Sequence, residues 1–158
     1  MNQVNRTGED RRQQSKKDVL ALEASRSETL SLYADLASHR PFSVNKQLQS
    51  EIKRFCEALI DYTASAHFQL YQHLEENKER RMSVYSVAEK VYDQIANTTD
   101  HILAFNDRYG DDVKSIDDTK KVEEDLSFLG EMLANRIQYE DQIIEALKMS
   151  GRRKDQAR

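Results

Sequence analysis

The sequence has no tryptophan, one proline, one cysteine and only four glycines among its 158 residues. All-β domains turn about every ten residues and place glycine or proline at those turns, so this composition argues against a β-sandwich or barrel. The single cysteine, Cys56, excludes an internal disulfide bond and a zinc site built from several cysteines, which suits the reducing cytoplasm. No apolar run approaches the roughly 18 residues of a membrane span, and the N-terminus lacks the apolar core of a signal peptide. We therefore expect a cytoplasmic, all-α protein that does not enter a membrane.

The charged residues divide the chain into an acidic body and two basic ends. The whole chain has a net charge of −4. Residues 1–17 hold five basic and two acidic side chains, and residues 152–158 hold four and one, so the stretch between them carries a net charge of −10. Phosphate backbones are bound mainly by cationic side chains, which argues against nucleic acid as a direct ligand. An acidic body favours a basic protein partner.

Apolar residues recur at helical spacing in four long segments. The pattern predicts helices over about residues 18–38, 45–76, 83–109 and 118–151. Asn45 is suited to cap the second helix, Pro41 requires the first to end before it, and Gly110 can close the third. Long amphipathic helices with short connections favour an antiparallel four-helix bundle.

The two ends of the chain are too polar to add to a core. We expect residues 1–15 to form a disordered polar and basic arm, residues 16–150 to form the helical bundle domain, and residues 151–158 to form a flexible basic tail. In the first helix the apolar stripe includes Val19, Leu22 and Leu30.

Candidate catalytic and metal-binding groups are few. None of the four histidines follows a glutamate by three residues, the spacing that di-iron bundles use. Cys56 is better explained as a small semi-buried residue than as a nucleophile, and no two glycines lie close enough for a phosphate-binding loop. We expect no enzyme activity, no cofactor and no metal site. A metal-binding bundle of hemerythrin-like architecture and an adaptor bundle with another target are the alternatives, and a monomer is expected over a weak homodimer.

Two polar residues fall on or beside the apolar face of the last helix. Glu140 shares the angular sector of the core residues, and Arg136 lies one turn earlier at the edge of that sector. Because a buried carboxylate is costly unless it is paired, we expect an internal Arg136–Glu140 pair, joined by His67 or a tyrosine hydroxyl. The alternative is a polar pocket that receives a side chain from a partner.

One aromatic residue falls on the polar face of the second helix. At 100° per residue Phe68 lies outside the apolar stripe and shares its sector with Glu57, Asp61 and Glu75. An aromatic ring among carboxylates is suited to dock a basic, partly apolar surface, with the ring as anchor and the acids steering. A single exposed phenylalanine without function is the alternative.

The same residues resemble a known family. The segment FCEALIDYTASAHFQLY, residues 55–71, is similar to the second-helix signature of the Rsd/AlgQ family, the bacterial regulators of sigma D. Residues 103–108 (LAFNDR) and 129–131 (LGE), with Arg136, Glu140 and Asp141, also agree with that family, and the likeness spans about residues 48–147. The chain departs from it at residues 20–23, where LALE stands in place of the usual Asp-Arg-Trp-Leu, and at Asp93, where a proline is usual.

The resemblance implies an anti-sigma factor. Members of the family are helical bundles that bind the primary sigma factor of RNA polymerase, chiefly its C-terminal promoter-reading domain, a basic helix-turn-helix unit. Binding would cover the surfaces that sigma uses for core polymerase and for the promoter. The residues that the resemblance assigns to contact the partner, or to support the contact, are Asp61, Tyr62, Ser65, His67, Phe68, Tyr71, Gln72, Arg136, Glu140 and Asp141.

Overall fold

The computed structural model describes residues 3–71, 82–110 and 118–156, with side chains described at 13–14, 16–71, 84–110 and 118–149. The described part of the chain holds four α-helices and one π-helical turn, and no strand. The elements are α1 (Gln3–Ser38), α2 (Lys46–Ala66), the π-helical η1 (His67–Tyr71), α4 (Met82–Tyr109) and α5 (Thr119–Gln156). The prediction of an all-α four-helix bundle is confirmed.

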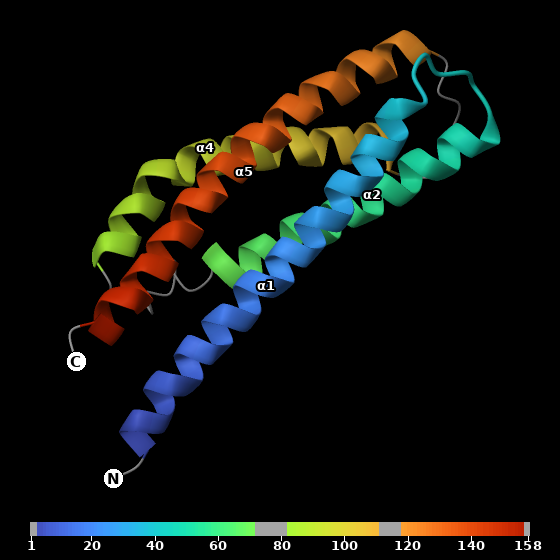
Figure 1. Cartoon of the computed structure of the whole chain (residues 1–158). Coiled ribbons are helices and arrows are strands. Elements are labelled where there is room, and N and C mark those ends of the chain that lie inside the picture. Colours follow the sequence, from blue (N-terminus) through green and yellow to red (C-terminus); the bar gives the residue numbers. More distant parts are fainter. Residues whose placement is uncertain (1–2, 72–81, 111–117, 157–158) are drawn as a thin grey trace.

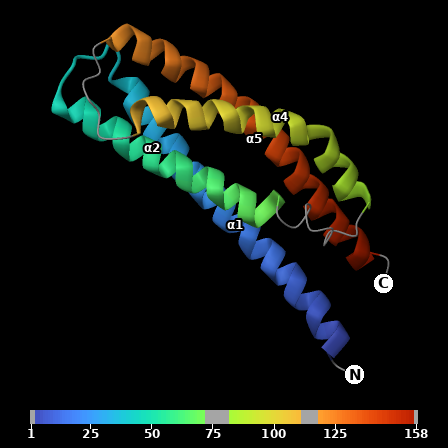
Figure 2. The ribbon, with the colours of Figure 1, turned by 180° about the vertical axis from the view of Figure 1, so that it is seen from behind.

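The helices form two pairs that lie against each other. Figure 1 shows α1 beside α2 and, above them, α4 beside α5. Smaller contacts join α2 to α4 and α1 to α5, so each helix has a neighbour on two sides. In the view from behind, Figure 2, the N-terminal part of α1 again projects beyond the other helices.

The predicted helix boundaries of the bundle are largely confirmed. Helix α1 ends at Ser38, before Pro41, and α4 ends at Tyr109, next to Gly110. The side chain of Asn45 accepts a hydrogen bond from the backbone N–H of Leu48 at 2.8 Å, which is the capping contact expected there. Such a cap satisfies one of the backbone donors that the first turn of a helix leaves free.

The helices differ from prediction at three ends. Helix α1 begins at Gln3 and α5 extends to Gln156, so residues expected in the disordered arm and in the flexible tail are helical. The helix expected over 45–76 is interrupted, because α2 gives way to the π-helical turn at His67, and residues 72–76 lie outside the described residues. The division of the chain into arm, domain and tail stays a prediction.

The core runs the length of the bundle. Its largest fully buried apolar side chains come from all four helices: Leu22, Leu36, Ile52, Phe55, Leu59, Tyr62, Ile102, Leu126, Leu129, Leu133 and Ile143. The rings of Tyr33, Phe55 and Phe105 pack in tilted and edge-to-face contacts at 5.8 and 6.1 Å between centroids. The apolar core therefore draws on all four helices.

The predicted apolar stripe of α1 is wrong at one position. Leu30 is 37% exposed, and its neighbour Thr29 is buried in its place. The Thr29 hydroxyl meets the carbonyl oxygens of Ser25 at 2.9 Å and of Ala58, on α2, at 3.2 Å. A threonine can occupy this interface because its hydroxyl reaches backbone acceptors.

Candidate partner-binding site

Phe68 lies at the end of the second helical segment and is 62% exposed. Glu57 and Asp61 are exposed on α2, at positions that share a helix face with Phe68. The ring of His67, also exposed, stands edge-on to that of Phe68 at 5.6 Å between centroids. The predicted exposure of Phe68 beside Glu57 and Asp61 is therefore confirmed, and Glu75, the third predicted acid, lies outside the described residues.

The exposed ring borders a groove between α2–η1 and α4. The groove has a volume of about 430 Å³. Its walls are mainly apolar, with Ile60 and Phe68 on one side and Ile95 and Leu103 on the other. Arg136, from α5, lines it as well, although only 1% of that residue is exposed. A mostly apolar groove with an aromatic rim is the kind of surface that accepts a side chain from a partner.

Behind the groove lies a buried ionic network centred on Glu140, which is 0% exposed. The Arg136 Nε donates to Glu140 Oε2 at 3.1 Å. The hydroxyl of Tyr62 donates to Oε1, and that of Tyr71 lies 3.5 Å from Oε2. The guanidinium of Arg136 also lies 5.6 Å from the centroid of the Tyr62 ring. The expected internal Arg136–Glu140 pair joined by a tyrosine hydroxyl is confirmed.

The network reaches every helix of the bundle. Arg136 Nη1 donates to the hydroxyls of Thr98 at 3.1 Å and Thr99 at 2.7 Å, both on α4. Arg26, on α1, places Nη1 3.6 Å from Glu140 Oε1 and 2.9 Å from a carboxylate oxygen of Asp141. A buried carboxylate with this many partners is satisfied, and removing one of its charged partners would leave the other charge uncompensated.

The protonation states of the network follow from its burial. Burial raises the pKa of the Tyr62 and Tyr71 hydroxyls above 10, and the negative charge of Glu140 raises both further. Both hydroxyls are therefore protonated at neutral pH and can donate to the carboxylate. Burial likewise raises the pKa of the Cys56 thiol to about 12, so Cys56 is a core residue and not an activated nucleophile.

The structure separates the ten predicted site residues into groups. Phe68, His67 and Asp61 are exposed, and Ser65 is half-buried. The buried network takes Tyr62, Tyr71, Arg136 and Glu140. Asp141 pairs with Arg26 of α1, away from the α2–α4 groove, and Gln72 lies outside the described residues.

Sequence reasoning missed three members of the network, namely Arg26, Thr98 and Thr99. Arg26 lies on a helix that is far away in the sequence. Thr98 lies in the apolar stripe of α4, where a small residue gives no sign of a polar contact, and Thr99 is half-buried beside it. The alternative that His67 joins the pair is wrong, since its side chain is exposed and its ring stands edge-on to that of Phe68. Only the i, i+4 spacing of Arg136 and Glu140 was visible in the sequence.

The described residues hold neither a cluster of metal ligands nor a helix suited to span a membrane. Within them, no three His, Cys, Asp or Glu side chains lie close enough together to hold a metal ion; His73 falls outside those residues. None of the described helices is long and apolar enough to cross a membrane.

Comparison with known proteins assigns the family. Residues 1–148 match the family model described as "Regulator of RNA polymerase sigma(70) subunit, Rsd/AlgQ". Among curated relatives, a Regulator of sigma D from Yersinia enterocolitica is 34% identical over 98 residues, which cover 61% of this chain and 59% of that protein. One from Enterobacter sp. strain 638 is 28% identical over 121 residues, covering 75% and 73%.

The chain aligns with slightly under three fifths of the length of the Yersinia relatives it matches. No solved structure gives a significant match. The family model nevertheless covers most of the chain, including α2, η1 and the residues of the Glu140 network. This chain therefore belongs to the Rsd/AlgQ family of regulators of the RNA polymerase sigma(70) subunit.

Proposed function

We propose that this protein is an anti-sigma factor that binds the primary sigma factor of bacterial RNA polymerase and sequesters it. The description of the family names the sigma(70) subunit, and the relatives from Yersinia and Enterobacter are named regulators of sigma D. The proposed target within sigma is its C-terminal promoter-reading domain, a basic helix-turn-helix unit. The acidic body, with its net charge of −10, supplies electrostatic attraction for such a domain.

The exposure of Phe68 beside the groove is the observation that carries the proposal. A large ring that is 62% exposed at the edge of an apolar groove is suited to anchor a partner. An apolar side chain from a sigma helix would enter the groove, while Asp61 and Asp100 attract the basic residues around it. No ion or covalent step is required, so the protein would act by binding and not by catalysis.

The proposed contact residues are the exposed part of the predicted set. Asp61, Ser65, His67 and Phe68 would touch sigma, and the buried Glu140 network would hold the helices that carry them. While bound, the sigma domain would be unable to reach core polymerase or the promoter. Regulation would then follow from competition for one surface of sigma.

A titration with matched controls tests the proposal. The C-terminal domain of the host's primary sigma factor would be titrated into this protein at low salt and followed by calorimetry. Phe68→Ala should weaken binding about 10- to 30-fold, the effect of removing an aromatic anchor. The control is Phe128→Ala, because Phe128 is 46% exposed but lies against His101, outside the groove. It should leave affinity within about twofold of wild type.

The charges need a control of their own. Asp61→Asn should weaken binding at low salt and reduce its dependence on salt, whereas Asp35→Asn, on the exposed face of α1, should do neither. Absence of binding by the wild-type protein at micromolar concentrations would contradict the proposed function. Equal losses for Phe68→Ala and Phe128→Ala would contradict the proposed site.

A further inference from the structure

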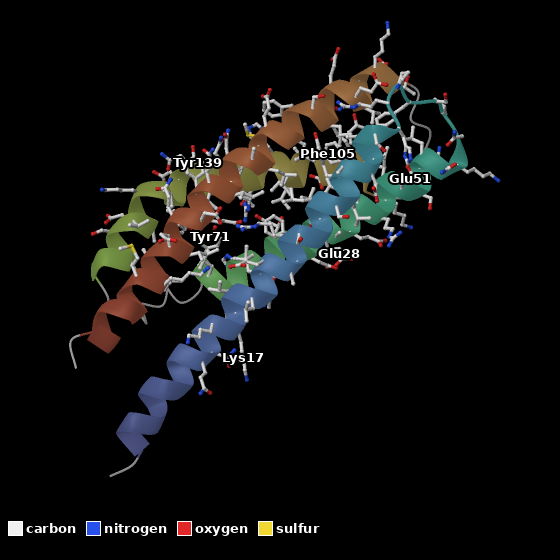
Figure 3. The ribbon with its side chains drawn as sticks, viewed as in Figure 1. Lys17, Glu28, Glu51, Tyr71, Phe105 and Tyr139 are labelled. Atoms are coloured by element: carbon white, nitrogen blue, oxygen red, sulfur yellow. The ribbon has the colours of Figure 1, made fainter. Side chains whose placement is uncertain are left out.

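The two tyrosines that meet Glu140 come from the same helical run and are nine residues apart. At 100° per residue, an uninterrupted α-helix would point Tyr62 and Tyr71 in opposite directions. In the structure both hydroxyls face one carboxylate, Tyr62 at Oε1 and Tyr71 at Oε2. The wider turn η1, at His67–Tyr71, reduces the angle between the two side chains, and Leu70 and Tyr71 within it are buried. Figure 3 shows Tyr71 between the α1–α2 pair and α5.

The π-helical turn carries a local cost. Such turns are rare because their backbone packing is poorer than that of an α-helix, and they occur most often at functional sites. Within η1 the side-chain carbonyl oxygen of Gln69 is buried, and no residue in the described part of the chain donates a hydrogen bond to it. Side-chain contacts are therefore needed to stabilise the turn. The side chains that η1 turns inward, Leu70 and Tyr71, provide such contacts.

The proposed contact residues are part of the same turn. His67 and Phe68 are the first two residues of η1, and both line the groove. If η1 returned to α-helical geometry, Tyr71, at the end of the turn, would rotate furthest from its present position, while His67 and Phe68, at its start, would rotate less. The direction of Tyr71 and the directions of His67 and Phe68 therefore depend on the same backbone conformation.

Resting on the proposed function, we propose that Tyr71 is a positioning residue for partner binding. By joining Tyr62 at the Glu140 carboxylate, it holds the π-helical turn and so fixes the direction in which Phe68 and His67 face sigma. Tyr71 lines the groove as well, but it is 5% exposed and its hydroxyl is directed to Glu140, so the role proposed for that hydroxyl is to hold the turn. Its role is specific to the hydroxyl, since the ring alone would fill the same space.

The test compares two variants, each of which deletes a tyrosine hydroxyl that contacts a carboxylate. Tyr71→Phe removes the contact to Glu140, and Tyr109→Phe removes the 2.5 Å bond from Tyr109 to Asp125, on the α4–α5 pair. For each variant, urea unfolding confirms the fold, amide hydrogen exchange is measured residue by residue, and affinity for the sigma C-terminal domain is measured by calorimetry. The Tyr109 variant controls for the general loss of one hydrogen bond.

We expect Tyr71→Phe to speed amide exchange across residues 67–71 and to weaken sigma binding about threefold, because a contact of 3.5 Å is weaker than a hydrogen bond of ordinary length. Tyr109→Phe should leave both quantities within about twofold of wild type. Equal affinities for the two variants, with the wild type binding, would overturn this proposal alone. Absence of binding by the wild type would overturn the proposed function as well.

Discussion

The buried pair of Arg136 and Glu140 should behave as one energetic unit. Glu140 is 0% exposed and Arg136 is 1% exposed, with 3.1 Å between Nε and Oε2. Glu140→Gln keeps the shape of the side chain but leaves the guanidinium without its carboxylate. We expect the free energy of unfolding to fall by about 3–5 kcal/mol, the usual cost of breaking a buried ion pair.

A double-mutant cycle tests whether the two residues are coupled, by removing each charge alone and then both together. Arg136→Met alone should also be strongly destabilising, because it leaves the carboxylate without its closest cation. In the double variant, Arg136→Met with Glu140→Gln, no uncompensated charge remains, and the amide oxygen can still accept from the tyrosine hydroxyls. The loss should therefore be smaller than the sum of the two single losses by about 2 kcal/mol.

Urea unfolding followed by circular dichroism measures all four proteins of the cycle. An exposed pair provides the control: Arg108 Nη1 lies 3.2 Å from Asp125 Oδ2, and the Arg108 side chain is 57% exposed. The cycle of Arg108→Met with Asp125→Asn should show a coupling of less than about 1 kcal/mol. Losses at Arg136 and Glu140 that add to within about 0.5 kcal/mol would refute the idea of a coupled buried network.

Two further predictions concern stability. Gly130→Ala should lower the free energy of unfolding in urea by about 1 kcal/mol or more, although alanine has the better helix propensity, because a Cβ there would lie 2.2 Å from the Tyr33 hydroxyl oxygen. In a Tyr33→Ala background the same change should be neutral or stabilising. An equal loss in both backgrounds would contradict the steric explanation. Stability should also fall at alkaline pH, because burial raises the folded-state pKa values of Tyr62, Tyr71 and Cys56 above their ordinary 10.0, 10.0 and 9.0. Each group stays protonated when folded and ionises when unfolded, so its contribution is complete below the ordinary pKa and declines by about 1.4 kcal/mol per pH unit above it. Urea midpoints at pH 8, 9.5 and 11 check this, and midpoints that do not fall would contradict it.

Helical periodicity predicted the parts of the site that depend on one helix. The exposure of Phe68 and the Arg136–Glu140 pair follow from spacing within α2–η1 and α5, and both are found. The contacts of Arg26 and Thr98 with this network could not be predicted, because they depend on how α1 and α4 rotate against α5. Such rotations are fixed by packing between helices, and the apolar pattern of one helix does not predict them.

The local geometry after residue 66 was also beyond prediction from spacing. The rule of 100° per residue assumes an unbroken α-helix, and the wider turn η1 changes where Tyr71 points. The helical start of α1 at Gln3 shows a second limit, because composition alone predicted an arm without structure. In both places the residues are compatible with a helix, but the sequence does not show where the α-helix begins or where it changes to a π-helical turn.

Mapping the sigma contact on this protein tests the central claim most directly. Backbone amide signals of the isotope-labelled chain would be followed by NMR as the unlabelled sigma C-terminal domain is added. The account predicts that the largest shifts cluster on the exposed face of α2, on η1 around Phe68, and on the groove side of α4 near Leu103. A cluster of shifts on α1 and α5 around Asp141, with α2 and η1 unaffected, would contradict it.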